Sequence, residues 1–239
     1  VCITDHMDLD FPETPDFPAN AFQFDLDEYF GQLNRLKEQY KGKLDLRIGV
    51  EIGLQKHLGE AYHRLTEAYP FDFVIGSVHL VGGQDPYYRK IFEGRTDEEV
   101  YRMAFRETLE NVEAVKDFDT LGHLDYVVRY GIHQAAEYSY RKFSDEIDAV
   151  LKKLIAEGKG LEMNLAGIKY GLGFPNPHPD VLKRYRELGG EIITIGADAH
   201  EPAHVAYEFE KATEILRECG FSYYAEFHGR KPVFQRIVP

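Results

Sequence analysis

The 239-residue sequence contains only two cysteines, lacks a long apolar run and has fewer basic than acidic residues. Two cysteines are too few for a disulfide framework, and neither Cys2 nor Cys219 belongs to a CxxC motif. We therefore expect two buried thiols and a reduced, cytoplasmic protein. No stretch approaches the ~20 apolar residues of a membrane span, and no secretory signal is recognisable, so a membrane partner is not expected.

The shortage of basic residues narrows the choice of partners. With 28 Lys and Arg against 41 Asp and Glu, the formal net charge is −13. Nucleic-acid backbones bind to basic faces, so nucleic acid is not expected as the main partner. Bound metal cations can reverse the local field in a cleft, which leaves a small phosphorylated substrate open. The sequence favours no particular oligomeric state.

Short apolar segments alternate with amphipathic segments along the chain. The pattern predicts strands at 1–4, 45–52, 71–78, 119–122, 160–164 and 192–196. It predicts helices at 26–40, 57–68, 97–116, from residue 144 to before 158, and up to about 188. Asp25, Thr96 and Ser144 are the expected N-caps. Alternating βα units predict a mostly parallel α/β sheet, barrel or open. Because no linker or repeat interrupts the pattern, we predict one domain over residues 1–239.

Five predicted strands end in histidine or acidic residues. These ends are Asp5-His6, Glu51, Ser77-Val-His79, His123-Leu-Asp125 and Asp198-Ala-His200. A single histidine at a strand end is more often packed or solvated than a ligand, but parallel strands bring all five ends to one edge. Imidazole and carboxylate without cysteine suit zinc, manganese or iron. The sequence therefore predicts a divalent metal site at that edge.

In this order the motifs resemble those of the polymerase and histidinol phosphatase (PHP) superfamily. The matching motifs are Thr-Asp-His6, Gly-x-Glu51, Ser-x-His79, Gly-His123-x-Asp and Asp198-x-His200. The segment Glu162-Met-Asn-Leu-Ala-Gly-Ile-Lys169, followed by Pro-x-Pro-x-Pro, is similar to the histidinol-phosphatase branch. The resemblance covers essentially the whole chain. It implies a distorted (β/α)7 TIM-like barrel that holds up to three divalent metals (zinc, manganese or iron) at the strand carboxyl ends.

The resemblance also implies roles for individual residues. The implied metal ligands are His6, Glu51, His79, His123, Asp198 and His200. Glu51 would bridge two metals, one completed by His79 and His123 and the other bound by Asp198. His6 and His200 would hold a third metal. Of this set, Glu51, Asp198 and His200 would be catalytic.

Other polar residues near these motifs are candidates for supporting roles. Arg129 and Lys169 are expected to contact the phosphate group of a substrate, where charge gathers in the transition state. Asp125 would orient His123 as an outer partner. The Asp8-Leu-Asp10 segment reads as a solvated turn, with recognition of a cationic amine as the less favoured alternative.

One departure from the family pattern stands out. PHP proteins begin with a strand that bears His-x-His, and the sequence given contains no such motif. It enters at the position of the second strand, so we expect the first βα unit to be missing, which puts two ligands of the Glu51–Asp198 site in doubt. The set of Glu51, His79 and His123 is intact. Three protein ligands and a water suffice for zinc, so fewer metals than three are expected to bind.

The leading hypothesis for function is metal-dependent hydrolysis of a small phosphomonoester. The resemblance implies L-histidinol phosphate, in histidine biosynthesis, with the attacking water activated by metal ions. Another hydrolase on the same scaffold, such as a phosphodiesterase, nuclease-like enzyme or protein-tyrosine phosphatase, is the first alternative. A non-catalytic metal-binding domain is the second.

Overall fold

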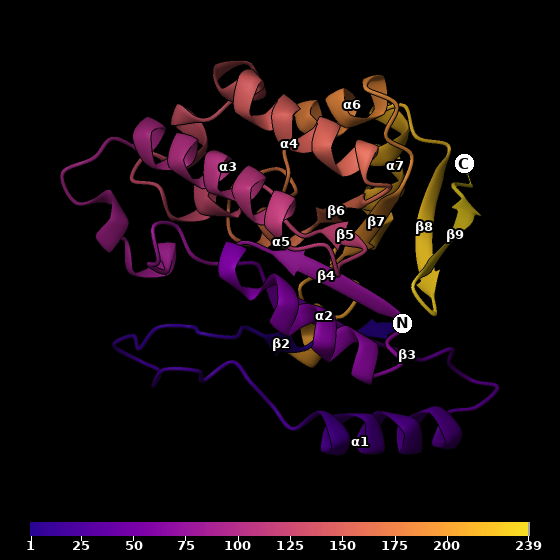
Figure 1. Ribbon diagram of the computed structural model, residues 1–239. Helices are drawn as coiled ribbons and strands as arrows, with labels where there is room; N and C mark the ends of the chain where they lie inside the picture. The colour runs from indigo at the N-terminus through magenta and orange to yellow at the C-terminus, as the bar shows by residue number, and fades with distance from the viewer. Residues whose placement is uncertain (239) are drawn as a thin grey trace.

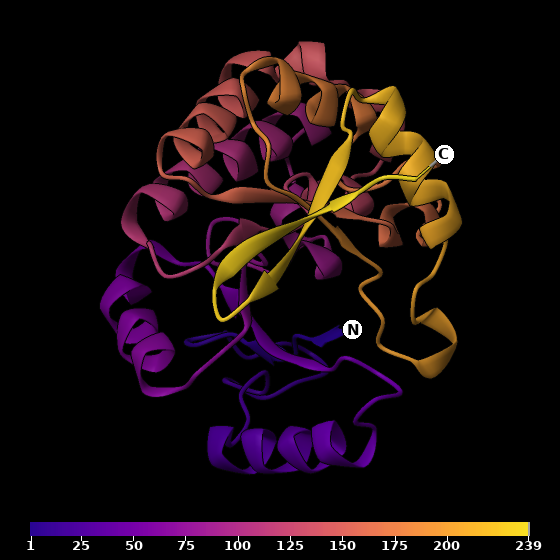
Figure 2. The same ribbon diagram turned by 90° about the vertical axis from the view of Figure 1, so that its right-hand side faces the viewer.

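The computed structural model describes residues 1–238. A parallel sheet lies at the centre and helices cover its outer face (Figure 1, Figure 2). The sheet contains β1 (Cys2–Ile3), β2 (His6–Met7), β3 (Arg47–Gly53), β4 (Phe73–Ser77), β5 (Thr120–Leu121), β6 (Gly160–Asn164) and β7 (Ile193–Gly196). The helices are α1 (Leu26–Gln39), α2 (Gly59–Ala68), α3 (Asp97–Ala114), α4 (Ser144–Ala156), α5 (Ala166–Lys169), α6 (Pro179–Glu187) and α7 (Phe209–Glu218). Within residues 1–238, none of the helices has the length and hydropathy needed to span a bilayer.

The strand order is β1-β3-β4-β5-β6-β7, and β2 extends the first edge by pairing with β3. Every pair in this sheet is parallel, and His6 lies opposite Glu51 in the register. The sheet is curled, but no ladder joins β7 to β1 within the described residues. It is therefore an open half-barrel. The prediction of a mostly parallel α/β sheet is confirmed, and the parallel register brings all strand carboxyl ends to one edge.

The two longest helices begin at the predicted N-caps. Asp25 accepts a hydrogen bond from a backbone amide in the first turn of α1. Thr96 forms a reciprocal capping box with Glu99 at the start of α3. The prediction for α4 is wrong by one residue: Ser144 already has helical backbone angles, and Phe143 occupies the cap position. The 3-10 turn Tyr140–Phe143 leads directly into α4, so the helix needs no separate capping side chain.

A hairpin of β8 (Tyr223–His228) and β9 (Lys231–Arg236) follows the half-barrel and was not predicted. The Phe227 ring stacks on Phe73 with 4.9 Å between the ring centroids. The hairpin therefore packs against the start of β4. Cys219, just before the hairpin, is buried as expected, whereas Cys2 on the edge strand β1 is exposed.

Candidate metal centre

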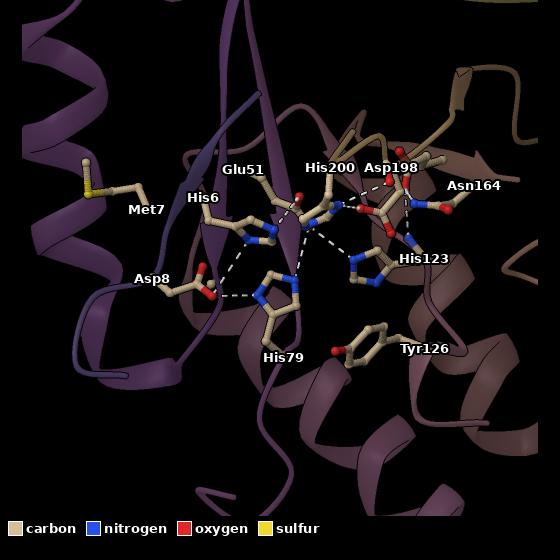
Figure 3. Close-up of polar contacts among 12 residues, drawn as sticks. His6, Met7, Asp8, Glu51, His79, His123, Tyr126, Asn164, Asp198 and His200 are labelled. Atoms are coloured by element: carbon tan, nitrogen blue, oxygen red, sulfur yellow. Dashed lines mark hydrogen bonds and ion pairs between the residues drawn. The ribbon is translucent and has the colours of Figure 1, made fainter. Parts of the chain in front are cut away.

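Glu51, on β3, lies at the centre of the carboxyl edge of the sheet (Figure 3). Its Oε1 is 3.1 Å from His79 Nε2 and 3.1 Å from His123 Nε2. Its Oε2 is 3.9 Å from His6 Nε2. Burial opposes ionisation of Glu51, but the charge of His6 and hydrogen bonds from His123 and His79 lower its pKa well below the usual value. Three strand ends thus bring imidazoles around one buried carboxylate.

Asp8 holds the other side of His79. Its Oδ2 is 2.8 Å from His79 Nδ1 and 3.9 Å from His6 Nδ1. Burial opposes protonation of His79, yet the charge of Asp8 and its hydrogen bond raise the pKa of His79 well above normal. Asp8 is buried, so the expectation of a solvated turn is wrong for Asp8, whereas Asp10 lies exposed in a turn as expected. Carboxylates often orient histidine ligands. The position of Asp8 two residues after the Thr-Asp-His6 motif was the sequence feature that could have indicated this role.

These side chains fit a divalent metal ion. A neutral His79 that donates from Nδ1 to Asp8 has an acceptor at Nε2, 3.1 Å from Oε1 of Glu51, and a bound metal ion can take the place of a proton between these two atoms. Donor atoms of Glu51, His79 and His123 all lie within 4.8 Å of one another, as do those of His6, Asp8 and His79. His6 Nδ1, Asp8 Oδ1 and His123 Nδ1 are buried without a hydrogen-bond partner among residues 1–238. Buried groups of this kind are costly unless a ligand satisfies them.

Asp198 and His200 approach the same cluster from the end of β7. His200 Nδ1 is 3.4 Å from Asp198 Oδ1, and the His200 ring is 5.6 Å from that of His6. The His200 side chain is 60% exposed, whereas that of Asp198 is 13% exposed. Burial opposes the charge of Asp198, but Arg129 lowers its pKa below the usual value. The structure therefore brings all six predicted ligands into one cluster, in which His200 has the most exposed side chain.

Both predicted phosphate ligands also lie beside Asp198. The Arg129 guanidinium donates from Nη1 to Asp198 Oδ2 at 3.2 Å, and Lys169 Nζ donates to the Asp198 carbonyl at 3.2 Å. The expected contact between Asp125 and His123 is not among the hydrogen bonds of the described residues. Instead, Asp125 accepts from Asn176 Nδ2 at 2.5 Å. Both carboxylate oxygens of Asp125 thus face the loop after β6, since Oδ2 accepts from the His178 backbone amide at 2.9 Å.

Glu162 on β6 is a buried carboxylate that was not among the predicted site residues. Its Oε2 accepts from the backbone of His123 at 3.1 Å and from Asn164 Nδ2 at 3.2 Å. Burial, and then the charges of Glu51 and Asp198, raise the pKa of Glu162 to about 8. Strand alternation was the available signal, because Glu162 and Asn164 are two residues apart and share one face of β6.

The cluster opens into a cavity of about 800 Å³ between the edges β1 and β7. Its lining includes His6, Glu51, Glu162, Asp198 and His200. On the opposite side, the ring of Tyr126 lies 5.7 Å from that of His79 and 4.8 Å from that of His123. Several carboxylates and imidazoles therefore face a space large enough for a small molecule.

Known proteins are similar to this chain in sequence and in fold. Residues 1–166 match the PHP domain family. The chain is 32% identical to the probable histidinol-phosphatase of Clostridium acetobutylicum over 234 residues, 98% of this chain and 84% of that protein. It is 31% identical to the histidinol-phosphatase of Lactococcus lactis over 242 residues, 97% of this chain and 84% of that protein.

A solved structure extends this likeness to three dimensions. The histidinol phosphate phosphatase of Lactococcus lactis, complexed with zinc, L-histidinol and phosphate, superposes with a TM-score of 0.82 at 29% identity. The alignment covers 97% of this chain and 86% of that chain. The predicted TIM-like fold of the PHP type is therefore confirmed.

Proposed function

Because the chain belongs to the PHP domain family, we propose that it is a metal-dependent phosphatase that hydrolyses L-histidinol phosphate to L-histidinol and phosphate. The buried cluster of Glu51, His79 and His123 is the observation that carries this proposal. Relatives named histidinol-phosphatase at 31–32% identity over nearly the whole chain support the substrate. The zinc, histidinol and phosphate of the Lactococcus lactis structure support both the metal and the ligand.

We propose that Glu51, His79 and His123 hold one divalent metal, that Glu51 and Asp198 contribute to a second site, and that His6 and His200 contribute to a third. A bound divalent metal acts as a Lewis acid, which lowers the pKa of a coordinated water and neutralises phosphoryl oxygens. Zinc is the first metal to test, because imidazole and carboxylate ligands suit it.

The chain itself supplies orientation, charge and proton transfer. Asp8 fixes His79 so that Nε2 faces Glu51. We assign proton transfer to Asp198, whose carboxylate would take a proton from the attacking water and return it to the leaving oxygen; His200 Nδ1 lies 3.4 Å from Asp198 Oδ1. The cations of Arg129 and Lys169 bind the phosphoryl oxygens, where positive charge stabilises the transition state most.

Phosphate release from L-histidinol phosphate tests this function, with p-nitrophenyl phosphate as a generic ester. In added zinc or manganese, the protein should hydrolyse histidinol phosphate with the higher kcat/KM. Glu51→Gln should lower turnover by at least about 100-fold, because the replacement removes a shared ligand charge. An absence of release with either metal would refute the proposal. Equal kcat/KM for both esters would show a phosphatase without this specificity.

A further inference from the structure

The guanidinium group of Arg129 is buried and held from three directions. Its Nε donates to Asn176 Oδ1 at 2.8 Å, and its Nη2 donates to Asn164 Oδ1 at 3.3 Å. Its Nη1 donates to Asp198 Oδ2 at 3.2 Å. An arginine has five N–H groups. Hydrogen bonds with the described residues therefore occupy one N–H on each nitrogen, and two N–H groups have no hydrogen bond among residues 1–238.

Two aromatic rings hold the guanidinium plane. The Cζ atom of Arg129 lies 5.1 Å from the centroid of Tyr126 and 4.9 Å from the centroid of Tyr170. Cations over aromatic faces at such distances are attracted by the ring quadrupole. The rings restrict the tilt of the guanidinium, while the polar contacts around its edge restrict its rotation.

The two asparagines that face Arg129 are anchored on buried carboxylates. Asn164 Nδ2 donates to Glu162 Oε2 at 3.2 Å, and Asn176 Nδ2 donates to Asp125 Oδ1 at 2.5 Å. Glu162 Oε2 also accepts from the His123 backbone amide, and Asp125 Oδ2 accepts from the His178 backbone amide, so each asparagine directs its amide nitrogen to its acidic partner and its amide oxygen to Arg129. The carboxylates thus determine which way both amides point.

The backbone joins the two asparagines into one rigid unit. Asn164 N donates to Asn176 O at 2.8 Å, and Asn176 N donates to Asn164 O at 2.8 Å. Both residues are buried. Gly167 allows this close approach, since a Cβ at that position would lie 2.8 Å from Asn176 Oδ1. The end of β6 and the loop that contains Asn176 therefore move together.

We propose that Asn164 and Asn176 are positioning residues that set the orientation of Arg129 for the phosphoryl group of the substrate. The inference rests on the proposed function, because it takes Arg129 as a phosphate ligand. A guanidinium that is already oriented loses little freedom when it binds an anion. A displacement of about 1 Å at such a site can cost a hundredfold in rate, so the anchors matter although they do not touch the substrate.

Exchanging the donor and the acceptor of one anchor tests this role. Asn176→Asp keeps an oxygen for Arg129 but sets a second carboxylate against Asp125, which turns the side chain out of place. The double variant Asp125→Asn with Asn176→Asp restores one donor and one acceptor. We expect the single variant to raise the Kd for inorganic phosphate and the KM for histidinol phosphate about tenfold or more, with a smaller fall in kcat. The double variant should return within about threefold of the native values.

Phosphate affinity is measured by calorimetry on the zinc-loaded protein, with Asn111→Asp as the matched control. Asn111 is a buried asparagine whose amide donates to a backbone carbonyl at 3.1 Å outside the Arg129 network. The control should lower thermal stability and leave phosphate affinity unchanged. Native affinity in Asn176→Asp, or equal losses in the single and double variants, would overturn the inference.

Arg129→Ala provides a second test if Asn176→Asp does not fold. Guanidinium ion should partly restore the phosphate affinity of this variant, because the asparagines and rings still frame the empty position. The absence of any restoration would count against a preformed cradle. Phosphate binding also separates the two proposals: a protein that binds phosphate through Arg129 but does not hydrolyse histidinol phosphate keeps the positioning role and loses the proposed function. Failure of the native zinc-loaded protein to bind phosphate would refute the inference itself.

Discussion

Removal of the Asp8 carboxylate should weaken metal binding although Asp8 lies behind His79. In the native structure, Oδ2 of Asp8 is 2.8 Å from His79 Nδ1, and Nε2 of the same ring is 3.1 Å from Glu51 Oε1. The carboxylate therefore selects the tautomer in which Nε2 is free to bind a cation. Asp8→Ala leaves His79 free to rotate and to take up the other tautomer.

The expected loss of metal affinity can be taken from other carboxylates that orient histidine ligands. Loss of a carboxylate that orients a histidine ligand typically lowers metal affinity about 10- to 100-fold, which corresponds to about 1.4–2.8 kcal/mol. At a fixed excess of zinc, the stabilisation from zinc binding falls by the same amount. For a domain of this length, the increase in Tm on adding zinc should become smaller by about 3–11 °C.

Thermal unfolding with zinc and with a chelator measures this difference, and Asp10→Ala is the matched control. Asp10 belongs to the same segment, but its carboxylate is 64% exposed and contacts only His57, at 3.1 Å, among the described residues. Comparing the zinc-dependent change in Tm removes any effect of the substitution on the metal-free protein. If Asp8→Ala and Asp10→Ala show the same zinc-dependent change, Asp8 does not orient a metal ligand and the reasoning fails.

Three further predictions concern the scaffold of the protein. The buried hydroxyl of Tyr62 bonds backbone carbonyls of β2 and β3 and an amide that follows β2, so Tyr62→Phe should lower the free energy of unfolding by about 1–3 kcal/mol in denaturant titrations. Hydrogen bonds from Arg184 lower the pKa of Asp148 from 3.8 to about 2. Since the folded-state pKa is the lower one, up to about 2 kcal/mol of stability should be lost as the pH falls from about 4 to 2, and Asp148→Asn should flatten that profile. Gly196→Ala places a Cβ against Glu162 Oε1 and should cost about 1–3 kcal/mol, again by denaturation; an unchanged midpoint would refute the close packing.

The sequence predicted best those helices and strands whose ends are marked by nearby residues, such as a capping residue or a glycine. The helix predicted at 97–116 has a capping box and a helical apolar period, and the structure has α3 at Asp97–Ala114. The strand predicted at 160–164 coincides with β6. The hairpin β8–β9 packs on β7 and on β4, and β4 is distant from it in the chain. The spacing of apolar residues within a segment does not indicate which distant strand it packs on. The hairpin was therefore not predicted.

Within the site, sequence reasoning found residues by type and position but missed their burial. The Asp8 segment looked solvated because its composition is acidic. Asp8 is buried because Gly53 leaves room for it: a Cβ on Gly53 would lie 2.7 Å from Asp8 Oδ1. Gly53 and Asp8 are far apart in the sequence and meet only in the folded protein. The sequence around either residue therefore does not reveal that Asp8 is buried.

The orientation of the predicted ligands also depends on more than the strands that lead to them. His79, His123 and Asp198 each lie two residues beyond the last residue of a strand, so alternation would place them on the face of that last residue. However, His123 and Asp198 have positive φ values of 21° and 51°, which are unfavourable for non-glycine residues and recur at functional sites. The contacts of Glu162 with the His123 backbone and of Arg129 with Asp198 oppose this strain. The buried network around β6, rather than strand geometry alone, therefore fixes the ligands in place, and this is why substitutions in it should alter ligand binding before they alter the fold.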